Sequence, residues 1–336
     1  MASVTPPRGM RDFLPAEKAR RERVLASIRS SYRAHGFDEI ETPVMEDADR
    51  LHSGLGGDNE KLAFAVMKRG LTEADLAAAA ASGDALALAD LGLRFDLTVP
   101  LARFYASHRA ELPPVFRALQ IAPVWRAERP QKGRYRQFVQ CDIDIIGDSS
   151  QLAEIELIAA TVAALDALGL SGCRIRINDR RVLTALLANW GVPAEAHGRV
   201  LISLDKLDKL GAAGVAAELS QLNLAAAFDE VDRVTGTLEA LASATWDSIA
   251  HSAPEWLDGS SFTELQRLRA ALPDVPLDFD PTLVRGMGYY TGTIFEISHP
   301  EVSYSLGGGG RYDGMIGRFL GQDVPACGFS IGFERI

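Results

Sequence analysis

The sequence predicts an α+β fold in which helices flank an antiparallel sheet and a helical insertion interrupts the sheet-forming chain. Two observations predict it. Segments with the apolar–polar alternation of strands are followed by amphipathic helices in residues 1–178, and strand character returns in residues 273–336. Between these parts, residues 179–272 are almost entirely amphipathic helix broken by Gly and Pro. We therefore expect one sheet domain made from the first and last parts of the chain.

The first part opens with a helix followed by a strand. Apolar residues recur at helical spacing over Pro15–His35, and Gly36 ends the helix. The alternation over Phe37–Val44 predicts a half-buried strand. Residues 71–89 predict a solvated helical excursion, to which we assign no chemistry. Apolar–polar alternation then predicts strands at Leu93–Leu97, Ala122–Trp125 and Phe138–Ile146. Apolar residues at 3.6-residue spacing predict a helix at Leu152–Leu168.

The remaining elements follow the same two periodicities. A short strand at Arg174–Ile177 precedes the helical part. The expected helices there are Val182–Leu187, Val200–Leu210, Ala212–Leu224 and Val231–Leu241. The expected closing strands are Tyr289–Ile297, Ser303–Leu306 and Ala326–Ile331.

Composition is that of an ordinary folded protein. The 336 residues are 47% hydrophobic and carry a net charge of −10, which argues against wholesale wrapping of nucleic acid but permits a local basic patch. Cys141, Cys173 and Cys327 are widely spaced, as in a reduced compartment. Neither a secretory signal nor a run of about 20 apolar residues is present. We expect a cytoplasmic protein that does not enter a membrane.

A basic loop stands out on this acidic chain. It runs from Trp125 to Phe138 and contains five cationic side chains, namely Arg126, Arg129, Lys132, Arg134 and Arg136. Guanidinium groups bind phosphate through two parallel hydrogen bonds, and Phe138 offers a face on which a base can stack. The alternative is an exposed hairpin with solvated charges, which five such charges alone would favour.

The strand after this loop has a polar face. Its period of two places Gln140, Asp142 and Asp144 on one side and apolar residues on the other. These groups suit a pocket wall that accepts hydrogen bonds from an ammonium or an imidazole N–H. An outward, solvated sheet face is an equally good interpretation.

Two glycine-rich clusters lie near the end of the chain. In the first, Arg285 precedes the pair Tyr289 and Tyr290, and an arginine there could neutralise the negative charge that develops during phosphate chemistry. The alternative is a tyrosine pair that is half buried at the start of a strand. In the second, four glycines precede Arg311 and Tyr312 and permit close approach of a ligand to the backbone. No Lys-Ser or Lys-Thr follows these glycines, so this is not the P-loop of nucleotide-binding proteins.

These clusters, in this order, resemble the signatures of the histidyl-tRNA synthetase family of class II aminoacyl-tRNA synthetases. The resemblance covers nearly the whole chain. The matching segments are Arg8–Pro15 (family opening), the helix and strand ending at Pro43 (motif 1), Leu93–Pro100 (amino-acid-binding strand), Arg126–Phe138 (motif 2), Leu204–Lys209 (helical insertion), Leu283–Glu296 and Gly307–Asp313 (histidine-specific motifs) and Gly328–Arg335 (motif 3).

The resemblance implies a role for each matching residue. Arg126 and Arg285 would be the catalytic residues, binding and neutralising the α-phosphate and the amino-acid carboxylate. The implied ATP-binding residues are Arg126, Glu128, Arg134, Phe138, Arg311 and Arg335, with Phe138 and Arg335 enclosing the adenine. The implied histidine-binding residues are Asp96, Thr98, Arg126, Gln140, Asp144, Arg285, Tyr289, Tyr290 and Tyr312. No protein metal site is implied; Mg²⁺ would bridge the ATP phosphates.

The family's activity gives the expected partners. These are histidine, ATP, the acceptor end of the tRNA for histidine, and a second copy of the chain bound through motif 1. Two other activities are possible within this fold family. One is the regulatory subunit of ATP phosphoribosyltransferase, whose relatives tend to lose the motif 2 residues kept here. The other is a paralogue that transfers the adenylate to a different acceptor.

The sequence departs from the family pattern at two places. Gly288 stands where an aspartate usually precedes the paired tyrosines, so the hydrogen bonding behind Tyr290 is expected to differ. The chain stops at Ile336, and the family's C-terminal anticodon-binding domain does not follow. We expect the sequence to be part of a longer protein.

Overall fold

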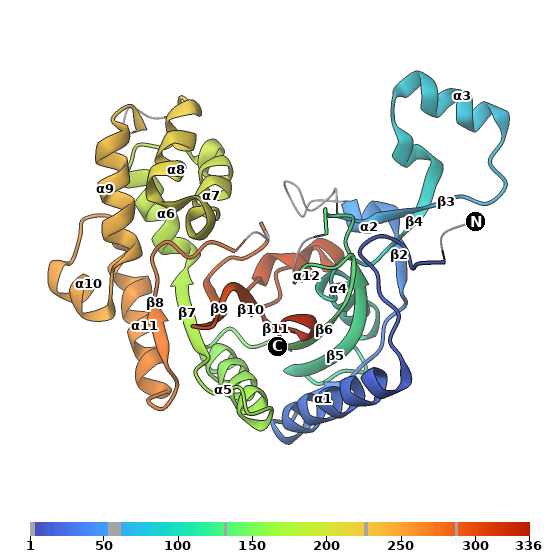
Figure 1. Ribbon diagram of the computed structural model, residues 1–336, viewed down its shortest axis with the longest axis horizontal. Helices are drawn as coiled ribbons and strands as arrows, with labels where there is room; N and C mark the ends of the chain where they lie inside the picture. The colour runs from blue at the N-terminus through green and yellow to red at the C-terminus, as the bar shows by residue number, and fades with distance from the viewer. Residues whose placement is uncertain (1–3, 53–61, 131–132, 225–227, 286–287) are drawn as a thin grey trace.

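The computed structural model describes residues 4–52, 62–130, 133–224, 228–285 and 288–336. Within these residues the strands form a large sheet and a small one (Figure 1). The large sheet contains, in spatial order, β1 (Asp38–Glu39), β5 (Phe116–Trp125), β6 (Gln137–Ile146), β11 (Ala326–Gly332), β10 (Val302–Arg311), β9 (Thr293–His299), β7 (Arg174–Asp179) and β8 (Leu277–Phe279). The small sheet contains β2 (Met45–Asp47), β4 (Ala89–Leu93) and β3 (Phe64–Met67).

The helices fall into three groups around the large sheet. Those in the first part of the chain are α1 (Pro15–Ala34), α2 (Ala48–His52), α3 (Glu73–Ser82), α4 (Thr98–His108) and α5 (Leu152–Ala167). Those between β7 and β8 are α6 (Arg180–Asn189), α7 (His197–Leu204), α8 (Leu207–Gln221), α9 (Val231–Ala242), α10 (Trp246–Ser252) and α11 (Gly259–Ala271). The last is α12 (Asp313–Leu320), and the chain ends in a short 3₁₀ turn, Phe333–Arg335.

The predicted α+β fold is confirmed, with one difference at the sheet edges. The inner strands pair antiparallel, as expected. The outer pairs, β1 with β5 and β7 with β8, are parallel. The helices between β7 and β8 are therefore the crossover connection that two parallel neighbours require.

The main core lies under the large sheet. Helices α1 and α5 cover one sheet face (Figure 1), and fully buried residues such as Ile28, Leu157 and Ile143 meet there. Trp246 and Phe262 belong to this same core, so α10 and α11 pack with the sheet. Helices α6 to α9 surround a second core of their own, which Leu283 and Ile294 join from the sheet side.

Some local predictions were wrong for identifiable reasons. Of the strand expected over Phe37–Val44, only Asp38–Glu39 pairs with β5, because the buried Arg94 guanidinium takes up the carbonyl oxygens of Thr42 (2.7 Å) and Pro43 (3.2 Å). The strand expected over Leu93–Leu97 ends at Leu93.

Helix α4 follows almost at once and was not predicted. The segment Leu93–Pro100 instead resembles the family's amino-acid-binding strand. Proline is tolerated here because it stands in the first turn, where its missing N–H costs no helical hydrogen bond.

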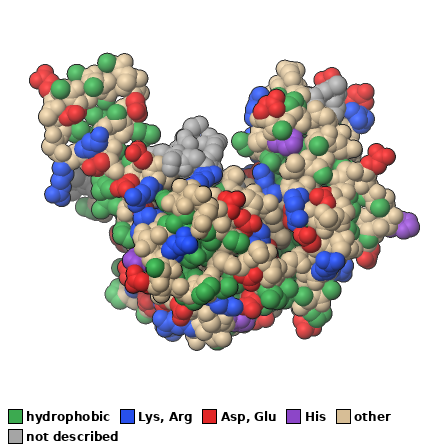
Figure 2. Space-filling view, turned by 180° about the vertical axis from the view of Figure 1, so that it is seen from behind, with side chains coloured by type: hydrophobic (Ala, Val, Ile, Leu, Met, Phe, Trp, Pro, Cys, Tyr) green, Lys and Arg blue, Asp and Glu red, His purple; other side chains and the backbone are tan. Residues whose placement is uncertain are grey.

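Neither positive nor negative side chains predominate on the face of the molecule seen in Figure 2. Basic and acidic side chains are interspersed there, and two lobes rise on either side of a hollow. No helix in the described part of the chain combines the length and the apolarity that crossing a bilayer requires. All three cysteines are free thiols, as expected.

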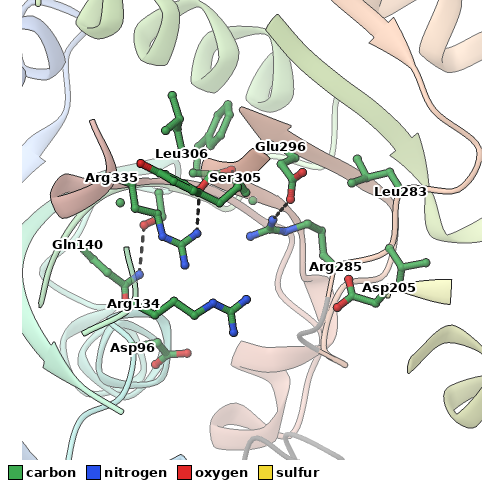
Figure 3. A pocket seen from close by; sticks show the side chains of 18 of the residues that line it. Asp96, Arg134, Gln140, Asp205, Leu283, Arg285, Glu296, Ser305, Leu306 and Arg335 are labelled. Atoms are coloured by element: carbon green, nitrogen blue, oxygen red, sulfur yellow. Dashed lines mark hydrogen bonds and ion pairs between the residues drawn. The ribbon is translucent and has the colours of Figure 1, made fainter. Parts of the chain in front are cut away.

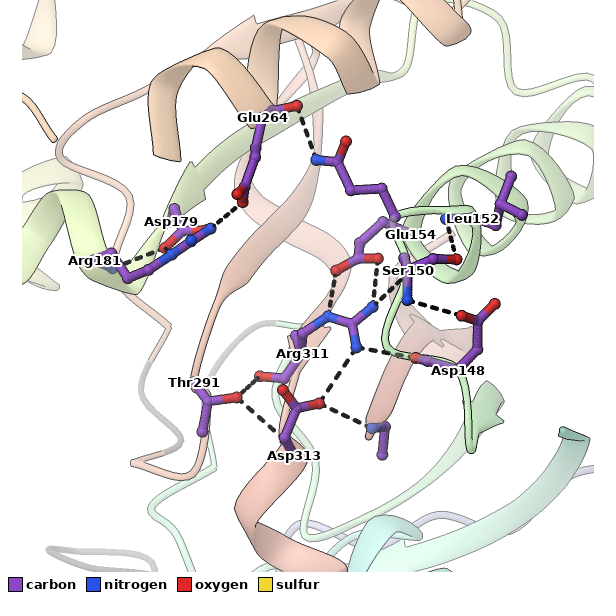
Figure 4. A network of polar contacts seen from close by, with 12 residues as sticks. Asp148, Ser150, Leu152, Glu154, Asp179, Arg181, Glu264, Thr291, Arg311 and Asp313 are labelled. Carbon is purple, nitrogen blue, oxygen red and sulfur yellow. Dashed lines mark hydrogen bonds and ion pairs between the residues drawn. The ribbon is translucent and has the colours of Figure 1, made fainter. Parts of the chain in front are cut away.

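A buried ion pair ties the end of β10 to α5 (Figure 4). The Arg311 guanidinium donates two 2.7 Å hydrogen bonds to the carboxylate of Glu154, which is 2% exposed. It also donates to the carbonyl oxygens of Asp148 (3.1 Å) and Ser150 (3.0 Å). This arrangement satisfies both charges away from water and fixes the loop that leads into α5.

We expect Arg311→Ala to lower the free energy of unfolding by about 3–5 kcal/mol, because it leaves the Glu154 carboxylate buried without its partner. Chemical denaturation measures the change. Arg267→Ala, at an exposed arginine of α11, is the matched control and should change stability by less than about 0.5 kcal/mol. Equal effects of the two substitutions would contradict the structural role of Arg311.

Candidate active site

A cavity of about 760 Å³ opens on the sheet face opposite α1 and α5 (Figure 3). Strands β6, β10 and β11 form its floor, and the corner between α7 and α8 contributes Asp205 and Asp208 to its rim. All of the predicted site residues except Arg311 line this cavity. They are Asp96, Thr98, Arg126, Glu128, Arg134, Phe138, Gln140, Asp144, Arg285, Tyr289, Tyr290, Tyr312 and Arg335.

One side of the cavity is cationic. Arg126 and Arg134 from the basic loop, together with Arg285 and Arg335 from two later stretches of the chain, approach the same space. Burial, together with the repulsion from the other three guanidinium groups, lowers the pKa of Arg335 to about 10. This concentration of like charge is unfavourable without a counter-anion, so the geometry suits a ligand with several negative charges.

Two of these arginines are fixed by backbone carbonyl groups. Arg126 donates from Nε to the carbonyl oxygen of Phe95 (2.9 Å), and its guanidinium carbon lies 5.0 Å from the centre of the Phe138 ring. Arg335 donates from Nη1 to the carbonyl oxygen of Ser305 (2.7 Å). Both guanidinium groups thus keep nitrogen atoms free to meet a ligand.

The structure separates the cations of the basic loop into different roles. Arg126 and Arg134 line the cavity, and Arg134 lies 3.5 Å from a carboxylate oxygen of Glu128. Arg136 donates to the carbonyl oxygen of Glu128 (3.0 Å) and so holds the loop together, whereas Arg129 is exposed. Lys132 lies outside the described residues. The solvated-hairpin interpretation therefore fits Arg129 but not Arg126, which is partly buried; Arg134 lines the cavity and remains exposed.

The opposite side of the cavity is acidic. Gln140, Asp142 and Asp144 line it from β6, as the period of two predicted, and Asp96 approaches from the turn before α4. Asp96 Oδ2 and Gln140 Oε1 are buried and have no hydrogen-bond partner in the described part of the protein. Buried polar atoms nearly always have partners, so these two acceptors point to a ligand that carries donors.

The carboxyl groups on this side hold protons unusually tightly. Burial raises the pKa of Asp144 to about 7, even though the Tyr312 hydroxyl donates a 2.6 Å hydrogen bond to it. Burial also raises the pKa of Asp96 to about 6. The rings of Tyr289 and Tyr312, 5.9 Å apart, enclose this end of the cavity. The acidic side is thus lined by buried carboxyl groups, and a bound cation or N–H donor would stabilise their ionised forms.

The glycine run of β10 makes room for Arg285. A Cβ atom on Gly308 would lie 2.7 Å from the guanidinium carbon of Arg285, so a side chain there would push the arginine away. In the same way, a Cβ on Gly328 of β11 would collide with the Asp144 carboxylate. The sequence suggested that the four glycines at 307–310 admit a ligand; the structure shows that Gly308 makes room for the Arg285 guanidinium, whereas a Cβ at the other three would first meet neighbouring backbone.

The expected contact of Arg311 with ATP is not supported. Its guanidinium turns towards α5 and binds Glu154, as described above, and this leaves it outside the cavity. Successive residues of a strand point to opposite faces. Tyr312 reaches the cavity from the neighbouring position, and Arg311 does not.

Sequence reasoning missed charged residues at the rim. Arg176, Asp205, Asp208 and Glu296 line the cavity, but none of them was given a role. Glu296 ends the matched segment Leu283–Glu296, and the two aspartates lie in the matched segment Leu204–Lys209, so the resemblance could have pointed to these three. Arg176 lies in an expected strand outside every matched segment.

The raised pKa of Asp144 predicts a pH-dependent gain in stability for Asp144→Asn. The folded protein keeps this proton up to pH about 7, whereas the unfolded carboxyl loses it near 3.8. Wild-type stability should therefore fall as the pH rises through this window, and the variant should escape the loss.

We expect the free energy of unfolding of Asp144→Asn to exceed that of wild type by up to about 4 kcal/mol at pH 8, and by little at pH 4. Urea denaturation of both proteins at the two pH values measures this difference. Asp90→Asn, at an exposed carboxylate, is the control and should show no such pH dependence. A gain that is the same at both pH values would contradict the shifted pKa.

Comparisons with known proteins find similarity to histidyl-tRNA synthetases along nearly the whole chain. The family model described as "Histidyl-tRNA synthetase" matches residues 9–336. A curated histidine–tRNA ligase of Leifsonia xyli subsp. xyli is 67% identical over 347 residues, covering 100% of this chain and 80% of that protein.

Two solved structures are similar in fold. One is a histidyl-tRNA synthetase from Nostoc sp. PCC 7120, with a TM-score of 0.79 and 26% identity, covering 100% of this chain and 74% of that one. The other is described as an ATP phosphoribosyltransferase regulatory subunit/histidyl-tRNA synthetase from Bacillus halodurans, with a TM-score of 0.79 and 25% identity, covering 99% of this chain and 82% of that one.

Proposed function

The chain belongs to the histidyl-tRNA synthetase family, and on this premise we propose that it activates histidine with ATP and transfers it to the 3′ end of its tRNA. The observation that carries the proposal is the division of the cavity into a cationic side and an acidic side. A polyphosphate fits the first side, and an amino acid with a cationic amino group fits the second. The reaction joins the two.

We place ATP on the cationic side. Arg126, Arg134 and Arg335 provide guanidinium groups for the phosphates, and Glu128 helps to hold Arg134 in the loop. The adenine would stack on Phe138, with Arg335 over its other face. The lowered pKa of Arg335 supports this placement, because bound phosphates would relieve the repulsion among the arginines.

We place histidine on the acidic side. Its amino group would donate to Asp96, Thr98 and Gln140, and the unpartnered oxygens of Asp96 and Gln140 support this choice. The imidazole would lie between Asp144 and Tyr290, with Tyr289 and Tyr312 closing the pocket. Burial of these groups means that an analogue without the imidazole N–H would leave Asp144 with Tyr312 as a donor but without the donor from the ligand.

The chemistry requires positioning and neutralisation of charge. The histidine carboxylate attacks the α-phosphorus in line, forming histidyl-adenylate and releasing pyrophosphate. Arg285 and Arg126 are the catalytic residues, because they would lie against the oxygens on which negative charge grows. In the second step the terminal ribose hydroxyl of tRNA attacks the adenylate carbonyl, and AMP leaves. No covalent enzyme intermediate is needed.

Magnesium fits the site as a companion of ATP. The ion usually binds one or two carboxylates together with substrate phosphates and water. Glu128 is a carboxylate on the cationic side that could meet such an ion, whereas both oxygens of Glu296 already accept hydrogen bonds from Arg285 and Arg176. This suits a metal held chiefly by the nucleotide. When bound, Mg²⁺ would neutralise the pyrophosphate that leaves.

Further proposals follow from the family. A second copy of the chain would bind through α1 and the segment after it, which match motif 1, and the enzyme would work in the cytoplasm, where tRNA is charged. The domain boundaries at residues 178 and 272 also remain proposals. The regulatory alternative is not favoured, since a relative 67% identical is a histidine–tRNA ligase.

The first experiment is histidine-dependent exchange of pyrophosphate into ATP, with the other amino acids as controls. We expect exchange with histidine alone, because the acidic side of the cavity selects its imidazole. This assay isolates the first step from any tRNA requirement. Absence of exchange in the folded protein would contradict the proposal, and transfer to an acceptor other than tRNA would identify the remaining alternative.

Arg285→Ala should reduce the exchange rate by at least about 100-fold, because one charge donor at a reacting centre has an effect of that size. The oligomeric state should not change. Sedimentation measures the assembly and the exchange assay measures the chemistry. An unaltered rate would rule out the role given to Arg285.

Asp144→Asn should raise the KM for histidine by at least about ten-fold, because it removes the charged acceptor of the imidazole N–H. The KM for ATP should change little, since Asp144 lies on the acidic side. Parallel titrations of the two substrates separate the effects. An equal rise in both KM values would indicate general damage to the cavity.

A further inference from the structure

Arg176 lies on β7 between three carboxylates. Its Nε donates to Asp280 (2.7 Å), and its Nη1 donates both to Asp208 at the start of α8 (2.8 Å) and to Glu296 on β9 (3.1 Å). Arg176 and Glu296 stand directly opposite each other in the β7–β9 pair. The arginine thus joins three elements that meet at the cavity rim.

Two of these carboxylates determine where Arg285 lies. Glu296 accepts a hydrogen bond from Arg285 Nη1 (2.5 Å) through the oxygen that Arg176 does not use (Figure 3). Asp280 accepts from the backbone N–H (2.9 Å) and the hydroxyl (2.6 Å) of Thr282, three residues before Arg285. Arg176 therefore supports both the side-chain partner of Arg285 and the backbone that leads to it.

The charge balance around Arg285 depends on the same arginine. Asp208, Asp280 and Glu296 place three negative charges beside Arg176, and Asp205 adds a further negative charge near Arg285. Without Arg176, Glu296 would lose its other cationic partner and, together with Asp205, would compete more strongly with a phosphate for the Arg285 guanidinium. A guanidinium bound strongly by protein carboxylates is less available to a developing charge.

We propose that Arg176 is a positioning residue: by neutralising Glu296 and Asp280, it holds Arg285 over Gly308 with its guanidinium available to the α-phosphate. Arg285 Nε, which is buried and has no hydrogen-bond partner in the described residues, is a donor left for that ligand. Arg176 does not itself touch the reacting atoms. The inference rests on the proposed function.

The test is the exchange assay on Arg176→Gln. We expect kcat to fall about ten-fold, while the KM values for histidine and ATP stay within about two-fold, because the loss concerns charge in the transition state more than binding. Arg176→Lys should recover part of kcat, since it restores the charge without the fork that reaches three carboxylates.

Arg174→Gln is the matched control. Arg174 lies on the same strand and binds a carboxylate of β8 through two hydrogen bonds to Asp278, both 2.5 Å, but it does not line the cavity. We expect its kcat to equal that of wild type. Thermal unfolding of every variant shows whether a loss of activity reflects a loss of fold.

A double-substitution cycle tests whether Arg176 acts through Arg285. Introduced into an Arg285→Lys background, Arg176→Gln should lower kcat by much less than ten-fold, because the group it positions is already altered. An undiminished effect in that background, or an unchanged kcat for Arg176→Gln alone, would overturn the inference. Wild-type protein that supports no exchange would instead overturn the proposed function.

Discussion

The closeness of charged side chains to the sheet backbone is the constraint on which the cavity depends. Arg285 lies against β10 and Asp144 against β11, and both positions exist only because Gly308 and Gly328 carry no side chain. Glycine weakens a strand, so the run in β10 is a cost to the sheet. The antiparallel neighbours β9 and β11 hold β10 in place on both sides and offset that cost.

The same floor keeps two incompatible groups of charges apart. Guanidinium groups gather around Arg335, whereas carboxyl groups gather around Asp144, and each group is destabilised by its own members. Among the described residues no salt bridge joins the two groups, although Arg285 pairs with Glu296 and Arg134 with Glu128. Charge that the protein relieves only in part is typical of a site that is completed by its ligand, and it favours substrates of opposite character at the two ends.

Sequence reasoning succeeded where periodicity carried the information. The face of β6 with Gln140 and Asp144, and the amphipathic helix α1, followed from spacing alone, whereas the roles of Arg126 and Arg285 came from the family resemblance. Reasoning failed where tertiary contacts overrule local preference. The Arg94 side chain donates hydrogen bonds to the carbonyl oxygens of Thr42 and Pro43, which a neighbouring strand would otherwise bind. No local pattern in the sequence predicts this contact.

Long-range contacts also explain the errors at the site. Arg311 was expected to bind ATP because it follows the four glycines in a segment that resembles the family, yet its partner Glu154 lies on α5 and could not be paired with it from the sequence. Arg176 was overlooked for the same reason. Whether the helices of residues 179–272 form a separate domain stays a prediction, although α10 and α11 share the core of the sheet.

The parallel pairing of β7 with β8 has a consequence for how this chain can vary. Strands that run side by side in the same direction need only some crossover between them, and its length is not fixed by the sheet. Helices α6 to α9 pack around a core of their own, so away from Leu283, Ile294 and the rim residues Asp205 and Asp208 they can lengthen or shorten without disturbing the strands beneath. Such changes would fall beside the cavity rim, so recognition of a large partner can change while the chemistry underneath stays the same.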